Sequence, residues 1–294
     1  MEASSVIVDT DVHNAILGIV GRARKIDRAP CLNDAALIAL DDPYSHRNYV
    51  HYTLTRDGMI VAYASVDMNR HSIQLVVDPP HRRRGYGRYL IDDLLTSHPD
   101  FSFWAFGNCE AAQHLASSLA MEKIRQLHIM EYRHDPPQLP PLPSGIEIRP
   151  YRSDDLSDLI RVNAVAFADH PEQGDMDKAS FNAYRNQPWY RDEDILVATD
   201  STGLIGFHWM KIQDEQSLAE IYVLGVSPQR QSLGIGSALV RYGLNHMYRR
   251  GAQRVILYVA GEEDRIIGFY MREGFHIVFS DAAYRLNGQA HGQI

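Results

Sequence analysis

The sequence predicts a mixed α/β protein, with an α+β mixed sheet in each of two tandem copies of one domain. Three observations predict this fold. A proline-rich segment divides the 294 residues into halves of similar length, strand and helix patterns alternate, and one glycine-containing pattern occurs once in each half. A chain of this length accommodates two domains of ordinary size. Repetition of the same elements at a near-constant spacing indicates duplication of a whole domain.

The boundary between the copies is expected in Asp135–Gly145, which contains five prolines in eleven residues. Proline lacks a backbone N–H and cannot continue a helix or a central strand. Such a segment is extended and semi-rigid. The expected organisation is an N-terminal domain over 1–135, a linker over 136–145 and a C-terminal domain over 146–294.

The two halves repeat one another element by element. Six residues recur 149 positions later: Leu75, Val77, Pro79, Gly85, Gly87 and Leu90 correspond to Leu224, Val226, Pro228, Gly234, Gly236 and Leu239. Each set describes an apolar strand, a proline turn, a polar loop, a G-x-G motif and a helix. Farther along, the offset becomes 154, because Phe103-Trp104-Ala105 matches Leu257-Tyr258-Val259 as a second strand.

Hydrophobic periodicity and helix-end signals predict the elements of the second half. Helices are expected at 154–167, 235–250 and 265–273, and strands at 145–151, 194–199, 203–213, 218–226, 254–259, 275–279 and 283–286. Gly274 directly follows the last helix, where a left-handed residue ends many helices. Strands that alternate with helices in this way are typical of a mixed α/β domain.

Composition and charge exclude several classes of protein. The formal net charge of −8 argues against a dedicated nucleic-acid binder. Cys31 and Cys109 match no metal-binding spacing, and no two histidines are three or four residues apart, so no metal site is expected. The sequence has neither a signal-peptide pattern nor ~18 consecutive apolar residues. The expectation is a cytoplasmic monomer with a small-molecule substrate and no nucleic-acid or membrane partner.

The glycine loops indicate a phosphate ligand. Gln231–Ser237 lies between a strand and a helix, and Arg82–Gly87 has the same place in the first half. Glycine lets the backbone approach a ligand closely, and the free N–H groups at a helix start attract an anion. Neither loop is a Walker motif or a complete dinucleotide fingerprint. The arginines of the first loop add positive charge for phosphates.

The pattern Gln/Arg-x-x-Gly-x-Gly/Ala between a strand and a helix, present twice, resembles motif A of the GNAT acetyltransferases. The resemblance implies two acetyl-CoA-binding folds, with acetyl-CoA as co-substrate and no metal. The backbone N–H near Leu224 is expected to polarise the acetyl carbonyl. The residues expected at the coenzyme are Leu75, Val76, Val77, Arg82, Arg83, Arg84, Gly85, Tyr86, Gly87, Leu224, Gly225, Val226, Gln231, Ser232, Leu233, Gly234, Ile235, Gly236 and Ser237.

Longer segments resemble the mycothiol synthases, a family of tandem GNAT enzymes: Ala166–Gly174, Gly206–Lys211, Glu220–Val226 and Leu257–Val259. The resemblance implies transfer of acetyl from acetyl-CoA to the cysteinyl amine of 1D-myo-inositol 2-(L-cysteinylamino)-2-deoxy-α-D-glucopyranoside, with mycothiol and CoA as products. It also implies that the second domain is catalytic and that the first binds acetyl-CoA without turning it over.

Two side chains of the second half are candidates for the proton transfers of direct acetyl transfer to an amine. Glu220, on the strand before the glycine loop, is the candidate base; the alternative is a solvated or salt-bridged strand carboxylate. Tyr270 is the candidate acid for the departing thiolate; the alternative is a packing tyrosine. The resemblance favours both catalytic roles. At the matching offsets the first half has His71 and Ala116, so it keeps the loop without these two groups.

The resemblance also implies an acceptor site formed by Asp34, Glu172, Lys211, Glu220 and Tyr258. A carboxylate can hold an ammonium group, and lysine and tyrosine can donate hydrogen bonds to sugar hydroxyls. From the residues alone, each of these side chains is equally compatible with an ordinary surface position.

One segment departs from the family pattern, and two other functions stay open. Glu262-Glu263-Asp264 places three acids near the expected polyanionic coenzyme, which is unfavourable unless they face solvent or the coenzyme contact is remodelled. The alternative functions are a GNAT enzyme with another amine acceptor, such as an antibiotic, a polyamine or a protein N-terminus, and a non-catalytic CoA-binding sensor.

Overall fold

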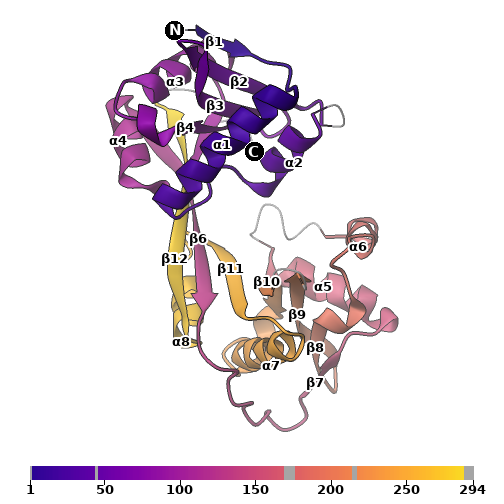
Figure 1. Ribbon diagram of the computed structural model, residues 1–294. Helices are drawn as coiled ribbons and strands as arrows, with labels where there is room; N and C mark the ends of the chain where they lie inside the picture. The colour runs from indigo at the N-terminus through magenta and orange to yellow at the C-terminus, as the bar shows by residue number, and fades with distance from the viewer. Residues whose placement is uncertain (1, 44–45, 169–175, 214–216, 288–294) are drawn as a thin grey trace. The chain divides into compact units, whose positions relative to one another are not determined.

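The computed structural model describes residues 2–43, 46–168, 176–213 and 217–287. The chain forms two compact units, each a mixed sheet with helices packed on it, as the sequence predicts (Figure 1). Unit 1 comprises Met1–His128, Ala260–Glu262 and Phe279–Ile294, and unit 2 comprises Ile129–Val259 and Glu263–Val278.

Unit 1 carries the first glycine loop between β4 and α3. Its elements are β1 (Glu2–Ser5), α1 (Thr10–Asp27), α2 (Asp34–Asp41), β2 (Tyr49–Arg56), β3 (Met59–Asp67), β4 (Ser72–Val77), α3 (Tyr86–Ser97), β5 (Ser102–Ala105), α4 (Glu110–Ser118) and parts of β6 (Met121–Tyr132) and β12 (Phe275–Leu286). Its strand order is β1-β2-β3-β4-β5-β12-β6. Asp9 begins α1 by accepting a hydrogen bond from the Val12 N–H, which satisfies one of the free donors of the first turn.

Unit 2 carries the second glycine loop between β10 and α7. Its elements are β7 (Glu147–Pro150), α5 (Leu156–Ala166), α6 (Lys178–Arg185), β8 (Ile195–Asp200), β9 (Gly203–Gln213), β10 (Leu218–Val226), α7 (Ile235–Arg249), β11 (Arg254–Ala260), α8 (Asp264–Arg272) and the remaining parts of β6 and β12. The strand order is β12-β6-β11-β10-β9-β8-β7, with β10 and β11 parallel.

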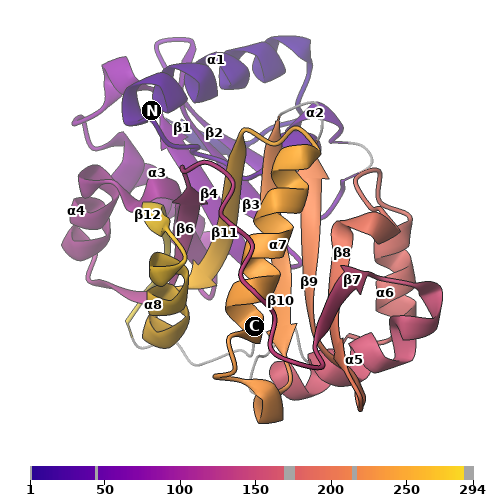
Figure 2. The same cartoon turned by 90° about the horizontal axis from the view of Figure 1, so that it is seen from below.

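Helices cover both faces of the sheet in unit 2. Figure 2 shows α7 lying across β9 and β10, where it buries Leu239 and Leu244. On the other face, α5 and α6 pack on a cluster that includes Phe207 and Trp209 of β9, with Phe181 of α6 completely buried. Both faces of β9 are therefore covered by helices, as expected for a central strand whose side chains point alternately to the two faces of the sheet.

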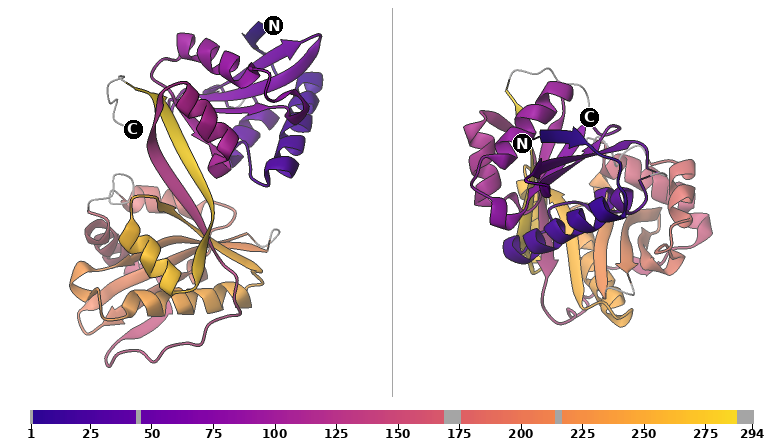
Figure 3. Two further views of the ribbon diagram at one scale, coloured as in Figure 1. Left: turned by 90° about the vertical axis from the view of Figure 1, so that its left-hand side faces the viewer. Right: turned by 45° about the horizontal axis from the view of Figure 1, so that its top comes forward.

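Strands β6 and β12 each contribute to both units, and Figure 3 shows them side by side. In unit 1, Ala282–Tyr284 of β12 pair antiparallel with Phe103–Ala105 of β5. In unit 2, Tyr132 of β6 packs on Phe275, with 5.3 Å between the ring centroids, and Glu131 accepts a hydrogen bond from Arg254 at 2.8 Å. Each sheet is therefore completed by residues from the opposite half of the chain.

Most of the elements expected in the second half are present, with two differences. The two expected strands at the C-terminal end are a single strand, β12, because the backbone continues extended from Phe275 to Leu286. Helix α6 has no strong sequence signal. It is two turns long and mostly polar, and it forms through a capping box of Asp177 and Ser180 and through the buried Phe181.

In the described ranges of the chain, no helix combines the length and the apolar character that a membrane crossing requires.

Candidate active site

The second glycine loop leaves the N-terminus of α7 open to a ligand. Ser232 and Gly234 have positive φ angles of 65° and 79°, and Gly234 is the residue before the first turn of α7. The first N–H groups of a helix have no intrahelical acceptor, and in this turn no side chain caps them. A concave set of backbone N–H groups at a helix start can bind a phosphate group.

The first glycine loop has the same backbone geometry. Arg83 and Gly85 have φ angles of 60° and 82°, and α3 also begins without a side-chain cap. The Arg82 Nε donates to the Val77 carbonyl at 3.1 Å, and the Gln231 amide donates to the equivalent Val226 carbonyl at 3.3 Å. The repeat in the sequence therefore corresponds to a repeat in backbone conformation.

The charges around the two loops differ. In unit 1, the two terminal guanidinium nitrogens of Arg82 donate to Asp27 at 2.7 Å, while Arg83 and Arg84 are exposed. In unit 2, the first loop residue is the neutral Gln231, and its amide oxygen accepts a hydrogen bond from the Arg265 guanidinium at 3.0 Å. A basic residue of α8 thus reaches the loop that has few basic residues of its own.

The parallel strands beside each loop separate as they approach it. Leu218–Glu220 of β10 pair with Arg254–Ile256 of β11, and in the described part of the chain the rest of β10 has its ladder partners on β9. In unit 1, Ser72–Gln74 pair with Ser102–Trp104 in the same way. The separation leaves one backbone edge of each strand available to a bound ligand.

Glu220 lies at the point where β10 and β11 begin to separate. Its side chain is 18% exposed, and one carboxylate oxygen is 3.9 Å from the Lys211 ammonium, across the β10–β9 ladder. Burial raises the pKa of Glu220 to about 6, and the positive charge of Lys211 opposes part of that increase. A carboxylate with such a pKa is ionised at neutral pH and is a better proton acceptor than an exposed one.

Tyr270 lies on α8 and is 7% exposed, packed between Phe269 and Phe275. Burial raises the pKa of its phenol well above the ordinary value, so the hydroxyl stays protonated through the neutral range. Ala116 has the equivalent place on α4, since α4 and α8 correspond residue for residue at the offset of 154.

The residues expected at the acceptor are only partly brought together. Lys211 contacts Glu220, whereas Tyr258 is on β11 and 48% exposed. Asp34 begins α2 in unit 1, but its side chain lies outside what the structure describes. Glu172 also lies outside the described residues.

An aromatic cluster beside Glu220 and Lys211 has no counterpart among the sequence predictions. Tyr184 and Trp189 contact Trp209 and Tyr222, with ring centroids 5.3–6.5 Å apart. The residues come from α6, the following turn and two strands. A sequence signal for this cluster was present in the aromatic-rich stretch that follows α6.

The expectation that His71 corresponds to Glu220 is wrong. The ladder between β10 and β9 shifts by one residue between Ile221 and Val223, so β10 has an extra residue that β4 lacks. Glu220 therefore corresponds to Ser72, which pairs with Asp67 on one side. The first unit has a hydroxyl where the second has the carboxylate.

The three acids Glu262, Glu263 and Asp264 are exposed. This exposure is compatible with the first of the two alternatives, in which the acids face solvent. Their neighbour Arg265 turns toward Gln231 instead, which places a positive charge on the side of the loop.

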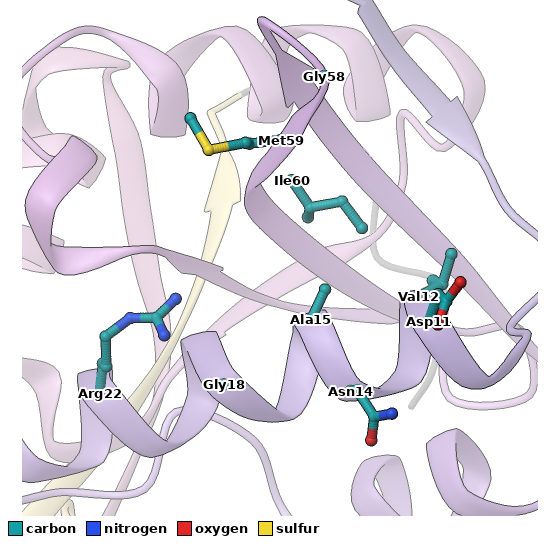
Figure 4. A pocket seen from close by; sticks show the side chains of 9 residues that line it. All are labelled: Asp11, Val12, Asn14, Ala15, Gly18, Arg22, Gly58, Met59 and Ile60. Carbon is teal, nitrogen blue, oxygen red and sulfur yellow. The ribbon is translucent and has the colours of Figure 1, made fainter.

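A separate cavity in unit 1, of about 450 Å³, lies between α1 and the turn that joins β2 to β3 (Figure 4). Arg22, Gly58 and Met59 help to line it, and none of its lining residues belongs to a glycine loop. Among the side chains that the structure describes, no group of three or more His, Cys, Asp or Glu residues could hold a metal ion.

Two glycine loops at open helix starts, each beside a pair of separating parallel strands, define the class of the protein. The model of the acetyltransferase (GNAT) family matches residues 22–118 and 163–275. The chain therefore belongs to the GNAT acetyltransferase family, and it is an acetyl-CoA-dependent N-acetyltransferase.

Within that family, the chain is similar to the mycothiol acetyltransferases. It is 36% identical to the mycothiol acetyltransferase of Propionibacterium freudenreichii over 94% of this chain and 89% of the relative. It is 34% identical to that of Streptomyces coelicolor, over 92% of this chain and 91% of the relative. At this identity and coverage, it is a member of the same tandem GNAT group as these enzymes.

Solved structures agree with the fold. A GCN5-related N-acetyltransferase from Sphaerobacter thermophilus superimposes with a TM-score of 0.72 at 20% identity, over 96% of this chain and 94% of that one. A tandem GNAT protein from the clavulanic acid biosynthesis pathway has a TM-score of 0.67 at 14% identity, over 96% of this chain and 97% of that one. Both likenesses extend over the two units.

Proposed function

We propose that the chain transfers acetyl from acetyl-CoA to the cysteinyl amine of 1D-myo-inositol 2-(L-cysteinylamino)-2-deoxy-α-D-glucopyranoside, giving mycothiol and CoA. The identity of 31–36% to mycothiol acetyltransferases over more than nine tenths of the chain supports this acceptor. The observation that carries the chemistry is the half-buried carboxylate of Glu220 on β10, the strand that leads to the open loop of unit 2.

In this mechanism the diphosphate of acetyl-CoA binds the N–H groups of the second loop, and the thioester lies between β10 and β11. Glu220 accepts a proton from the acceptor ammonium, and the amine nitrogen attacks the thioester carbonyl carbon. The backbone N–H near Leu224 stabilises the developing oxyanion. As the C–S bond breaks, Tyr270 donates a proton to the departing CoA thiolate, and the surplus proton of the new amide nitrogen returns to the phenolate through solvent.

Lys211 and Tyr258 are proposed to donate hydrogen bonds to hydroxyl groups of the acceptor, and Glu172 and Asp34 to contribute carboxylates. Unit 1 is proposed to bind a second acetyl-CoA through Arg83, Arg84 and its own loop without chemistry. Ser72 and Ala116 stand there in place of the base and the acid, which supports a binding role alone.

The acceptor is tested with a panel of amines and detection of the released CoA thiol. The cysteinyl-glucosaminyl-inositol should be acetylated on nitrogen with a kcat/KM at least ~10²-fold above that of polyamines, aminoglycosides and peptide N-termini. Higher activity on another amine would show that the proposed acceptor is wrong, while the protein would still be an N-acetyltransferase. Binding of acetyl-CoA without turnover of any amine would favour a sensor.

Arg265→Gln should raise the KM for acetyl-CoA about tenfold, or ~1.4 kcal/mol, with kcat nearly unchanged. The reason is that Arg265 is the cation that contacts the second loop from α8. Steady-state kinetics are measured with acetyl-CoA and with acetyl-pantetheine, which lacks the diphosphate. The substitution should raise the KM for acetyl-CoA and leave the KM for acetyl-pantetheine unchanged. Arg272→Gln is the control, since Arg272 is also exposed on α8. An unchanged KM for acetyl-CoA would remove Arg265 from the coenzyme site.

A further inference from the structure

The Lys211 ammonium lies between two attractive partners. Its Nζ is 3.9 Å from a Glu220 carboxylate oxygen and 5.5 Å from the centroid of the Trp189 ring. The first contact crosses the ladder between β9 and β10, and the second reaches the turn after α6. A cation within about 6 Å of an indole centroid is attracted by the negative face of the ring.

The ion pair between Lys211 and Glu220 is long for unit 2. Most other pairs in this unit are shorter, from 2.7 Å for Arg149 with Asp155 to 3.1 Å for Arg185 with Asp192, and Arg250 lies 3.7 Å from Glu193. Lys211 and Glu220 are directly opposite in the ladder, so the backbone register does not force them apart. The same ammonium lies 5.5 Å from the centroid of the Trp189 ring.

Trp189 is held in place by aromatic neighbours. It makes edge contacts with Tyr222 at 5.3 Å and tilted contacts with Trp209 and Tyr184 at 6.3 and 6.5 Å between centroids. Tyr222 lies at the irregularity in β10, two residues after Glu220. The ring that attracts Lys211 is therefore fixed relative to the strand that carries the carboxylate.

We propose that Trp189 is a positioning residue, which shares the Lys211 ammonium with Glu220 and prevents the lysine from forming a tight ion pair with the carboxylate. The proposal rests on the proposed role of Glu220 as the base. A carboxylate in a tight ion pair is a poor proton acceptor, because the adjacent cation stabilises its ionised form. A ring that keeps the ammonium away from the carboxylate leaves Lys211 available to contact the acceptor, and it preserves the basicity of Glu220.

The surroundings of Glu220 in the described chain make this arrangement testable. Lys211 faces it from β9, Tyr222 lies near it on β10, and Tyr184 of α6 contacts Tyr222. On β11 the ladder partner is Ile256, which is apolar. Lys211 is thus the charged group whose position sets the proton affinity of Glu220, together with burial.

The test uses Trp189→Leu and Trp189→Phe in the full chain. Trp189→Leu should release Lys211 to Glu220 and lower the pKa of Glu220 by about one unit, as a closer opposite charge does. The acid limb of the kcat/KM profile should move to lower pH by the same amount, and kcat should fall. Trp189→Phe keeps an aromatic face and should restore most of the wild-type profile.

Two controls separate positioning from a general packing defect. Tyr190→Leu opens a similar space in the same aromatic cluster, on the side of Trp209 and Phe181, and should leave the acid limb unchanged. In a Lys211→Met background, Trp189→Leu should cause no further shift. A shift that persists without the lysine, or an unmoved acid limb in Trp189→Leu, would overturn the proposal.

Titration of the Glu220 carboxyl by ¹³C NMR, assigned by difference with Glu220→Gln, gives a readout that does not depend on the acceptor. If the wild-type chain does not acetylate the cysteinyl-glucosaminyl-inositol, the proposed function fails while this titration still decides the role of Trp189. If the enzyme is active and the carboxyl titration is the same in Trp189→Leu and wild type, the positioning role alone fails.

Discussion

Glu220→Gln is expected to lower kcat by ~10²-fold or more at pH 7.5, with little change in acetyl-CoA binding. The amide has nearly the same shape as the carboxylate but accepts no proton from the acceptor ammonium. The wild-type kcat/KM should decline as the pH falls through about 6, because burial raises the pKa of Glu220 to that value and protonation removes the base. The variant should lack this acid limb.

The measurement is the full pH–rate profile of both proteins, with acetyl-CoA affinity determined separately by calorimetry. The same pKa predicts an effect on stability with a defined sign. Since the folded-state pKa lies above that of an exposed glutamate, ionisation of Glu220 opposes folding as the pH rises through about 6. Glu220→Gln should therefore be slightly more stable than wild type at pH 8. Retention of an acid limb near pH 6 in the variant would assign the base to another group.

Tyr270→Phe is expected to lower kcat by ~10²-fold as well, while the fold and the KM for acetyl-CoA are retained. Phenylalanine fills the same space between Phe269 and Phe275, so only the hydroxyl is lost. Burial raises the pKa of the phenol, and no basic limb from Tyr270 should therefore occur below pH ~10.

The identity of the acid is checked with acyl donors of different leaving groups. The aryl thiolate of an acetyl aryl thioester leaves without protonation. The loss of kcat in Tyr270→Phe should therefore be much smaller with this donor than with acetyl-CoA. Tyr242→Phe is the matched control, since Tyr242 is a partly buried tyrosine of the same core cluster on α7. An equal deficit with both donors would indicate that Tyr270 acts through packing.

The parts of the fold that are encoded locally were accessible from the sequence. The glycine loops depend on residues that can adopt a positive φ within a few positions of a strand end, so Gly85 and Gly234 predict both loops and the helices that follow. The place of Glu220 on the strand before the second loop was accessible for a similar reason, because strand and loop are adjacent in the sequence.

The parts that depend on contacts between distant segments were not accessible. A β-bulge adds one residue to β10, and no local pattern distinguishes that from an ordinary strand, so the correspondence of Glu220 with Ser72 required the ladder register. Arg265 of α8 contacts Gln231, and Trp189 of the turn after α6 contacts Lys211. Their side-chain contacts cross between elements that the sequence does not place next to each other.

The shared strands β6 and β12 have a consequence for how the protein is made. The sheet of unit 1 includes Ala282–Tyr284, which are synthesised after β7–β11 of unit 2, although β1–β5 belong to the first part of the chain. Domains generally fold as they emerge from the ribosome, starting with the N-terminal one. Here the first-made sheet must wait, with an unpaired edge at β5, until β12 has been translated. A nascent chain stalled anywhere before β12 would therefore present this edge to chaperones or to aggregation.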